Sequence, residues 1–243
     1  MESFAVLLEP YKDLISSSAA IATYLHQLSA FAICNSIRKQ KSTVGFSIIP
    51  FLVGTVISII FLRFGLILND TTTLHVNLIG TALNLGYVCY YFYYTNNVKD
   101  KTLAWIQIGY ASAFVAAVFL YTYIENPKDL PFRYGLILTG VLFYFVGSPM
   151  LHLGEIIRNK STAGMPFPII LSGTLISFLW FLYGVVTREY FVIFQNAVFL
   201  LMNAVQLSLF AVYGFPKPTH KSKKSDSYRP AKTCSNNNDK KKN

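Results

Sequence analysis

Charged side chains are scarce in this chain of 243 residues, which has only 11 Asp and Glu against 21 Lys and Arg. Charged residues make up 13% of the chain and hydrophobic residues 53%, and the mean hydropathy is +0.43. A soluble domain usually carries charge on about a quarter of its residues, so this composition excludes an ordinary soluble protein. Apolar surface on this scale is stable in lipid, and the composition therefore predicts an integral membrane protein.

Cysteine is also rare, with only Cys34, Cys89 and Cys234 in the chain. The topology derived below places all three at or near the cytosolic side of the membrane, where structural disulfides are not expected. The chain shows no Gly-rich phosphate loop, Ser/His pair or cluster of metal ligands that stands out. We therefore expect no enzyme, no bound cofactor and no metal site.

Long apolar runs are what the chain does contain. Each is close to the roughly 20 residues that a helix needs to cross the hydrocarbon core. Backbone groups in lipid must satisfy their own hydrogen bonds, so the runs are expected to be helices. Seven such runs predict an all-α membrane protein with seven transmembrane helices near residues 14–34, 46–68, 70–94, 103–124, 134–154, 167–186 and 189–213.

Lys and Arg are distributed unevenly between the loops. Sixteen of them follow the first, third, fifth and seventh runs, whereas four lie on the other side. Because basic loops stay in the cytosol, the N-terminus is predicted outside and the C-terminus in the cytosol. Nine of the sixteen lie in the tail, residues 216–243, which we interpret as a solvated, disordered segment rather than a nucleic-acid-binding one.

The sequence repeats itself at an offset of 119 residues. The offset aligns Lys41 with Lys160, Gly54 with Gly173, Ser58 with Ser177, Asn77 with Asn196, and Asn84 with Asn203. Two parallel three-helix repeats joined by an unpaired linker helix (3+1+3) would place both halves in the same orientation. The predicted units are residues 1–95, the linker helix in 96–130, residues 131–215 and the tail.

Several motifs resemble the SWEET (saliva) family of sugar transporters. They are residues 160–167 (KSTAGMPF), 180–184 (WFLYG) and the dipeptide 195–196 (QN), with 41–43 (KST), 46–50 (FSIIP) and 77–80 (NLIG) in the first repeat. The resemblance covers nearly the whole chain up to about residue 213. It implies a bidirectional, facilitative sugar uniporter that works by alternating access.

The resemblance also implies a substrate site. It places the sugar between Asn77 and Asn196, whose carboxamides offer the donors and acceptors that a sugar hydroxyl needs. Interhelical hydrogen bonding is the alternative role for such residues. The family's outer pocket layer corresponds here to bulky residues, which favour a monosaccharide such as glucose: His26, Phe61, Phe145 and Trp180.

Hinges near the cytosolic side are implied at four related positions. Three hold proline, namely Pro50, Pro149 and Pro166, and the fourth holds Ala30, a departure from the family. Proline weakens a helix because it removes a backbone donor. Helix 1 therefore either moves as a rigid rod or needs no hinge of its own.

The resemblance places an outer gate at Phe64, Tyr183 and Glu189. Phe64 lacks the hydroxyl of the usual tyrosine, and Asn69 occupies the place of the basic partner expected for the acid. Glu189 is therefore expected to pair with Arg188, with Lys128 or with nothing.

No Asp or Glu lies in the middle of an apolar run. Proton-coupled carriers usually need a buried acid, so uniport is expected. A lysosomal-type amino-acid exporter of the Pro-Gln class and a seven-helix receptor are the alternatives, although the chain contains no Pro-Gln dipeptide. The expected partners are a small sugar and the lipid bilayer, and the expected location is the plasma membrane, with the Golgi, another endomembrane and homo-oligomers left open.

Overall fold

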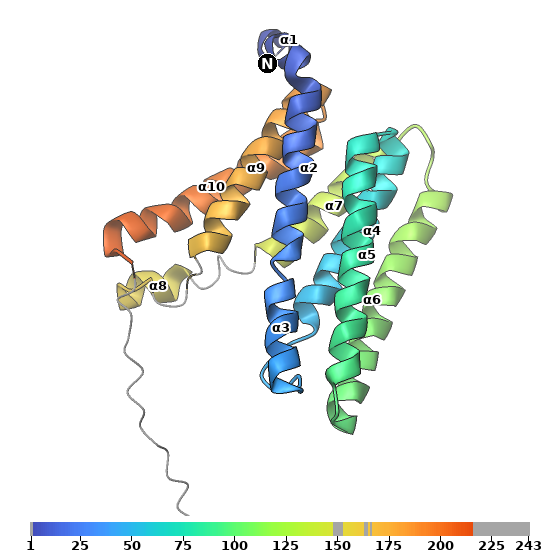
Figure 1. Ribbon diagram of the computed structural model, residues 1–243. Coiled ribbons are helices and arrows are strands. Elements are labelled where there is room, and N and C mark those ends of the chain that lie inside the picture. Colours follow the sequence, from blue (N-terminus) through green and yellow to red (C-terminus); the bar gives the residue numbers. More distant parts are fainter. Residues whose placement is uncertain (1, 148–152, 163–164, 166, 216–243) are drawn as a thin grey trace, which may run out of the picture.

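The computed structural model describes residues 2–147, 153–162, 165 and 167–215, and these residues form helices and connecting turns with no strand. Figure 1 shows the arrangement of the helices. In chain order they are α1 (Glu2–Leu8), η1 (Glu9–Tyr11), α2 (Lys12–Leu28), α3 (Phe31–Gln40), α4 (Ile49–Leu68), α5 (Thr71–Tyr94), α6 (Val98–Ile124), α7 (Leu130–Val146), α8 (Leu153–Asn159), α9 (Phe167–Thr187) and α10 (Tyr190–Tyr213).

Four of these helices are long and apolar enough to cross a membrane, namely α4, α6, α9 and α10. The predicted all-helical membrane fold is thus confirmed. The third predicted run coincides with α5, whereas the first is divided between α2 and α3. The fifth run begins within α7, and its residues 148–152 lie outside the described residues. Seven spans in a 3+1+3 layout remain a prediction.

Six helices pack in a closed ring. Within the first half, α5 packs against α4 and α2, and within the second half α10 packs against α9 and α7. The halves meet where α2 packs against α9 and where α4 packs against α7. Helix α6 packs on α4 from outside the ring (Figure 1). This ring leaves its interior available for a site.

The two ends of the ring differ. At one end, which we call the α1 end, α1 packs against α9 and the halves lie close together. Toward the opposite end, the α3 end, the second half diverges from α3, α4 and α5 (Figure 1). The separation of the halves thus increases from the α1 end to the α3 end.

Backbone turns repeat at the offset seen in the sequence. Among the described residues, those other than glycine with positive φ are Lys41, Asn69, Lys160 and Arg188. Left-handed backbone is uncommon outside glycine, yet these residues form two pairs, 41 with 160 and 69 with 188, that are each 119 positions apart. The loops after corresponding helices therefore turn in the same way in both halves.

The helical hydrogen bonding is interrupted at Ser29 and Ala30, between α2 and α3. Both residues keep right-handed helical φ, at −59° and −62°, but the Ser29 amide donates to the carbonyl three residues back and the Ala30 amide makes only a 3.4 Å bond to Gln27. An interruption therefore exists at the hinge position that lacks proline. The first span is not one continuous helix.

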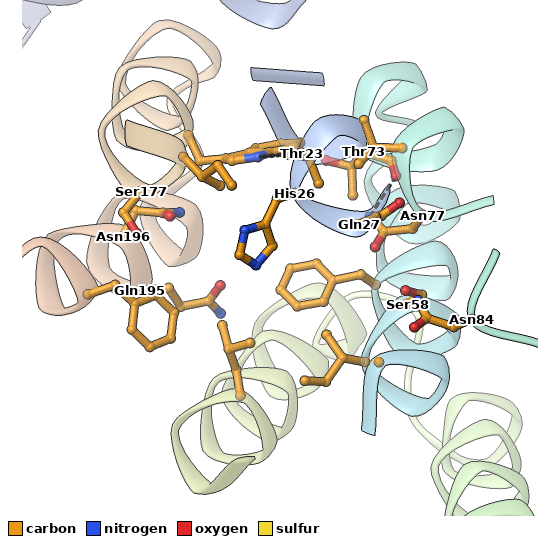
Figure 2. A pocket seen from close by; sticks show the side chains of 18 of the residues that line it. Thr23, His26, Gln27, Ser58, Thr73, Asn77, Asn84, Ser177, Gln195 and Asn196 are labelled. Atoms are coloured by element: carbon orange, nitrogen blue, oxygen red, sulfur yellow. Dashed lines mark hydrogen bonds between the residues drawn. The ribbon is translucent and has the colours of Figure 1, made fainter. Parts of the chain in front are cut away.

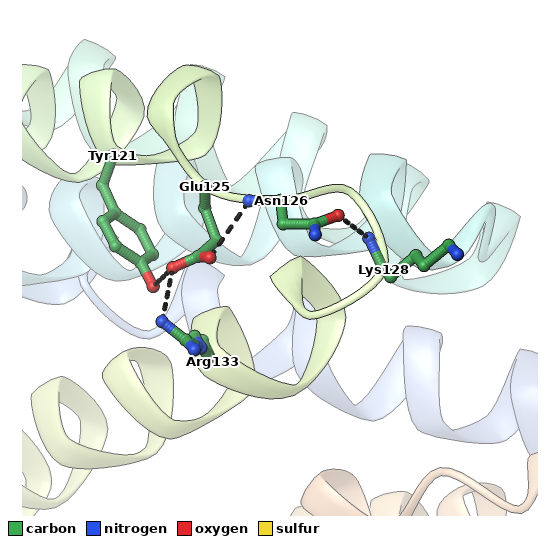
Figure 3. Close-up of polar contacts among 5 residues, drawn as sticks. All are labelled: Tyr121, Glu125, Asn126, Lys128 and Arg133. Atoms are coloured by element: carbon green, nitrogen blue, oxygen red, sulfur yellow. Dashed lines mark hydrogen bonds and ion pairs between the residues drawn. The ribbon is translucent and has the colours of Figure 1, made fainter.

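Charged groups join α6 to α7 at the α1 end (Figure 3). The Glu125 carboxylate accepts hydrogen bonds from the Tyr121 hydroxyl and from the Asn126 amide, and Arg133 Nη1 donates to it at 3.1 Å. The hydrogen bond from Tyr121, followed by that from Asn126, lowers the pKa of Glu125. In the turn that follows, Asn126 Oδ1 accepts a hydrogen bond from the Lys128 amide. These contacts fix the α6–α7 turn while leaving α6 outside the ring.

Candidate functional site

A cavity of about 450 Å³ lies inside the ring. Residues from α2, α4, α5, α7, α9 and α10 line it, so every ring helix contributes. Figure 2 shows His26 of α2 pointing into the cavity, between Gln195 and Asn196 on one side and Gln27 and Asn77 on the other. The cavity is the strongest candidate for a substrate site because it lies between the two halves rather than within either.

Asn77 and Asn196 both line this cavity, from α5 and α10. Each Nδ2 donates to the backbone carbonyl four residues earlier, of Thr73 and Val192 respectively, and both bonds are 2.8 Å long. A carboxamide has two N–H donors and an acceptor oxygen, so each keeps one donor and its oxygen for another partner. The local bond also fixes the side chain against its own helix.

Further pairs at the 119-residue offset line the cavity, and two of them add polar or aromatic groups. Ser58 corresponds to Ser177, and Phe61 corresponds to Trp180. The Trp180 Nε1–H donates to Thr23 Oγ1 at 2.9 Å across the interface between α9 and α2. That bond orients the indole ring, so Trp180 presents a defined aromatic face beside the amide pair.

The four bulky residues predicted for the outer layer are not all brought together. His26, Phe61 and Trp180 line the cavity, and His26 Nδ1 lies 3.2 Å from Ser172 Oγ. Phe145 is not among the described lining residues; it packs instead beside the apolar cluster of α4, α6 and α7 and against the ring of Tyr144. The second half thus contributes one aromatic wall residue from the predicted set.

Two glutamines extend the polar surface and were not among the residues predicted for the site. Gln195 is 1% exposed and donates through Nε2 to Thr139 Oγ1 at 2.6 Å. Gln27 also lines the cavity, and its Oε1 is buried without a hydrogen-bond partner in the described part of the chain. Neither has a glutamine at the repeat-related position, so no repeat signal could have identified them.

Asn84 lines the cavity close to the break between α2 and α3. Its Nδ2 donates to the Gly80 carbonyl at 2.8 Å, and a Cβ added to Gly54 would lie 2.4 Å from its Oδ1. Gly54 is therefore required for Asn84 to lie against α4. Its counterpart Asn203 is not among the described lining residues.

At the α1 end, a hydrogen bond between side chains connects α9 of the second half to the start of α5 in the first half. The hydroxyl of Tyr183, on α9, donates to Asp70 Oδ1 at 2.6 Å. Asp70 also begins α5, since Oδ1 accepts from the amides of Thr72 and Thr73. We call the pair Tyr183 and Asp70 the outer contact. The family resemblance implied Tyr183 for the gate but did not identify its acceptor.

The repeat-related counterpart of the outer contact would be Phe64 with Glu189. Phe64 is 1% exposed, is stacked on the ring of Tyr134 at 6.1 Å, and has no hydroxyl to donate. Glu189 precedes α10 and forms no ion pair within the described residues. Burial, and secondly the charge of Asp70, raises the pKa of Glu189. The outer contact is therefore made on one side of the ring alone.

Of the three predicted hinge prolines, Pro50 alone lies within the described residues. Pro50 lies in the first turn of α4, where its missing N–H would have no helical acceptor, so it does not weaken the helix interior. Pro149 and Pro166 lie outside the described residues. Ala30 lies at the interruption between α2 and α3 and also lines the cavity.

Two groups of three helices that enclose a cavity between them are the arrangement of the secondary transporters built from repeats. The model of the family described as "Sugar efflux transporter for intercellular exchange" (MtN3/saliva) matches residues 13–99 and 132–218, two segments that start 119 positions apart. The chain belongs to this family, the SWEET transporters.

Individual relatives agree with this membership. The chain is 31% identical over 203 residues to "Sugar transporter SWEET1" of Drosophila pseudoobscura pseudoobscura, covering 83% of this chain and 89% of that one. It is 32% identical to "Bidirectional sugar transporter SWEET2b" of Oryza sativa subsp. indica, covering 80% and 85%. A solved structure described as a eukaryotic SWEET transporter matches with a TM-score of 0.76 at 26% identity, over 85% of this chain and 98% of that one.

Proposed function

We propose that this chain is a bidirectional, facilitative sugar uniporter and that the sugar binds between Asn77 and Asn196. The observation that carries the proposal is the pair of amides. They lie 119 residues apart, make the same local hydrogen bond, line one cavity from opposite halves, and each keep an acceptor and a donor. A hydroxyl that both donates and accepts matches such a pair. The names of the relatives, sugar transporters, point to the same substrate class.

The walls of the cavity support a monosaccharide such as glucose. Phe61 and Trp180 supply aromatic faces on which the C–H face of a pyranose can stack, and His26 projects between the two amide-bearing walls (Figure 2). These three side chains are large, so they limit the space beside the amide pair. We therefore expect a single sugar ring to be transported more efficiently than a disaccharide.

Alternating access is supported by the unequal ends of the ring. The halves are hydrogen-bonded at the α1 end through the outer contact, and they diverge at the α3 end. Basic residues concentrate at the α3 end, where Arg38, Lys39, Lys41 and Lys99 lie, and basic loops face the cytosol. In the proposed orientation the N-terminus is outside, the cavity faces the cytosol, and the protein resides in the plasma membrane.

Uniport is supported by the composition of the cavity wall. The described lining residues include no Asp or Glu, whereas proton-coupled transport usually uses an acid within the membrane. A sugar gradient is then the only driving force, and flux should follow it in either direction. Imposing a proton gradient should leave the initial rate of uptake unchanged.

Radiotracer uptake in cells that lack endogenous sugar transport tests the proposal. Asn77→Ala and Asn196→Ala should each remove most glucose flux at unchanged surface expression. Asn203→Ala is the matched control, because it changes the same residue type on α10 outside the described cavity wall, and it should retain flux. Flux that survives both site variants would refute the site, and sucrose flux equal to glucose flux would refute the monosaccharide assignment.

A further inference from the structure

A second cavity, of about 420 Å³, lies on the opposite side of α4 from the sugar cavity. It is bounded by α4, α5 and α6, and almost all the side chains that line it are apolar. It forms because α6 packs chiefly on α4 and leaves space beside α5. Only 11% of the apolar window of α6 is buried, so the rest of this helix faces its surroundings. We call this cavity the α6 groove.

A single face of α4 forms one wall of the α6 groove and ends in a positive charge. Leu52, Val56 and Ile59 line the groove at spacings of four and three residues. Arg63 follows four residues after Ile59, and residues at such spacings share one face of a helix. The guanidinium therefore lies at the groove's end nearest the α1 end of the molecule.

Contacts with α6 place the Arg63 side chain at this position. Its Nη2 donates to Thr122 Oγ1 at 3.0 Å, and the guanidinium carbon lies 5.9 Å from the ring centroid of Phe119 and 5.6 Å from that of Tyr123. Phe119 is itself a lining residue of the groove. The charged group thus lies directly above the last apolar side chain of the groove wall.

Within the described part of the chain, no negatively charged side chain neutralises Arg63. The structure shows no carboxylate paired with Arg63 among the described residues, and its Nε is buried there without a hydrogen-bond partner. An arginine within a membrane normally pairs with another group. The planar guanidinium of arginine presents several N–H donors in a fixed fork, and this fork can bind two oxygens of a phosphate at once.

We propose that the α6 groove binds a phospholipid, with an acyl chain between α4, α5 and α6 and the phosphate against Arg63. An apolar cavity excludes water, and in a bilayer the available apolar molecules are lipids. The phosphate supplies the negative charge that the described residues do not. Arg63 lies about one turn from the end of α4, which is the depth at which lipid headgroups are expected. The inference is independent of the sugar site, because it uses other residues on another face of α4.

Native mass spectrometry of the purified full-length protein tests this site. Wild-type protein titrated with phosphatidylcholine or phosphatidylglycerol should retain one phospholipid after excess detergent is removed. Arg63→Gln should bind about tenfold more weakly, which is the loss expected for one charge-assisted hydrogen bond, and Arg63→Lys should recover part of it. Arg133→Gln is the matched control because Arg133 lies at the same end, is 55% exposed and is paired with Glu125, and it should bind as wild type does.

Ligands that carry only one part of a phospholipid distinguish the contribution of the phosphate from that of the acyl chains. Diacylglycerol lacks the phosphate and glycerophosphate lacks the chains, so both should bind much more weakly than phospholipid. Ala116→Phe, which fills the groove, should reduce phospholipid binding while Arg63 is intact. Unchanged binding by Arg63→Gln would overturn the proposal, and so would cholesterol binding as tightly as phospholipid, which would identify a sterol as the occupant. Sugar flux in the same variants reports separately on the sugar site.

Discussion

Removing the Tyr183 hydroxyl should weaken closure at the α1 end. Tyr183→Phe deletes the 2.6 Å hydrogen bond to Asp70 but keeps the aromatic ring and its 5.3 Å contact with Trp180. A hydrogen bond to a charged group contributes about 1.5–3 kcal/mol. Tyr183 is 2% exposed but Asp70 is only half-buried, so we take the lower value, about 1.5 kcal/mol. That corresponds to roughly a tenfold change in the equilibrium between closed and open ends.

Cysteine accessibility measures this equilibrium directly. Ser58→Cys places a thiol in the cavity wall, and a membrane-impermeant thiol reagent applied to intact cells reaches it only when the α1 end opens. Tyr183→Phe should raise the labelling rate about tenfold. Tyr91→Phe is the matched control, because its hydroxyl bonds to the Phe46 carbonyl within the first half, and it should not change the rate. Equal labelling of wild type and Tyr183→Phe would refute the role of the outer contact.

The same end should respond to pH through Glu189. Burial, and then the charge of Asp70, raises the pKa of Glu189 above its ordinary value of 4.5. Because its pKa is raised, Glu189 binds a proton more tightly in the closed structure than it would in water. Protonation of Glu189 at low pH therefore stabilises closure, and this stabilisation is lost as the pH rises through the raised pKa of Glu189. Above pH 4.5, labelling of Ser58→Cys should therefore increase by more than the ionisation of the introduced thiol alone produces, and Glu189→Gln should remove this additional increase. An additional increase retained in Glu189→Gln would assign it to another group.

Two further substitutions test local packing and backbone in thermal unfolding experiments on the detergent-solubilised protein. Gly54→Ala should destabilise it by about 1–3 kcal/mol, because the added Cβ would lie 2.4 Å from Asn84 Oδ1, whereas Gly86→Ala meets nothing within 4 Å and should not. Ala30→Pro should be tolerated, since the Ala30 φ of −62° suits proline and its amide makes only a 3.4 Å bond. Ala22→Pro, inside α2, should cost about 3 kcal/mol. Equal effects of the two prolines would show that the interruption does not relax the backbone.

Hydropathy was sufficient to predict most of the helices, and the resemblance to the SWEET family, together with the repeat, indicated the central pair of amides. Lipid requires long apolar segments, so span positions are readable from composition alone. The amides were identifiable because Asn77 and Asn196 coincide at a fixed offset within a motif. Ser58 and Ser177 coincide in the same way, and that signal could have added them to the site.

Contacts between helices account for what was missed. Spacing along one helix determines which residues share a face but not which residues of another helix they meet. The bonds of Gln195 to Thr139, of Arg63 to Thr122 and of Tyr183 to Asp70 all join different helices. The interruption at Ala30 was missed for a different reason: its position lacks the proline by which such breaks are usually recognised.

The two interfaces between the halves differ in chemistry, and this difference explains the position of Phe145. Between α2 and α9, Thr23 bonds to Trp180 and His26 contacts Ser172. Shifted by 119 residues, those pairs become Leu142 with Phe61, and Phe145 with Val53, none of which has a side-chain hydrogen-bonding group.

His26 is oriented into the cavity by a polar partner on the neighbouring helix (Figure 2). The position related to Ser172 is Val53, which carries no hydrogen-bonding group, and burial of Phe145 beside the apolar cluster of α4, α6 and α7 is favourable for an aromatic ring. Residues at related positions of a repeat therefore share a backbone location without sharing a role. A family pocket residue can be transferred to this chain only where the partner that orients it is also present.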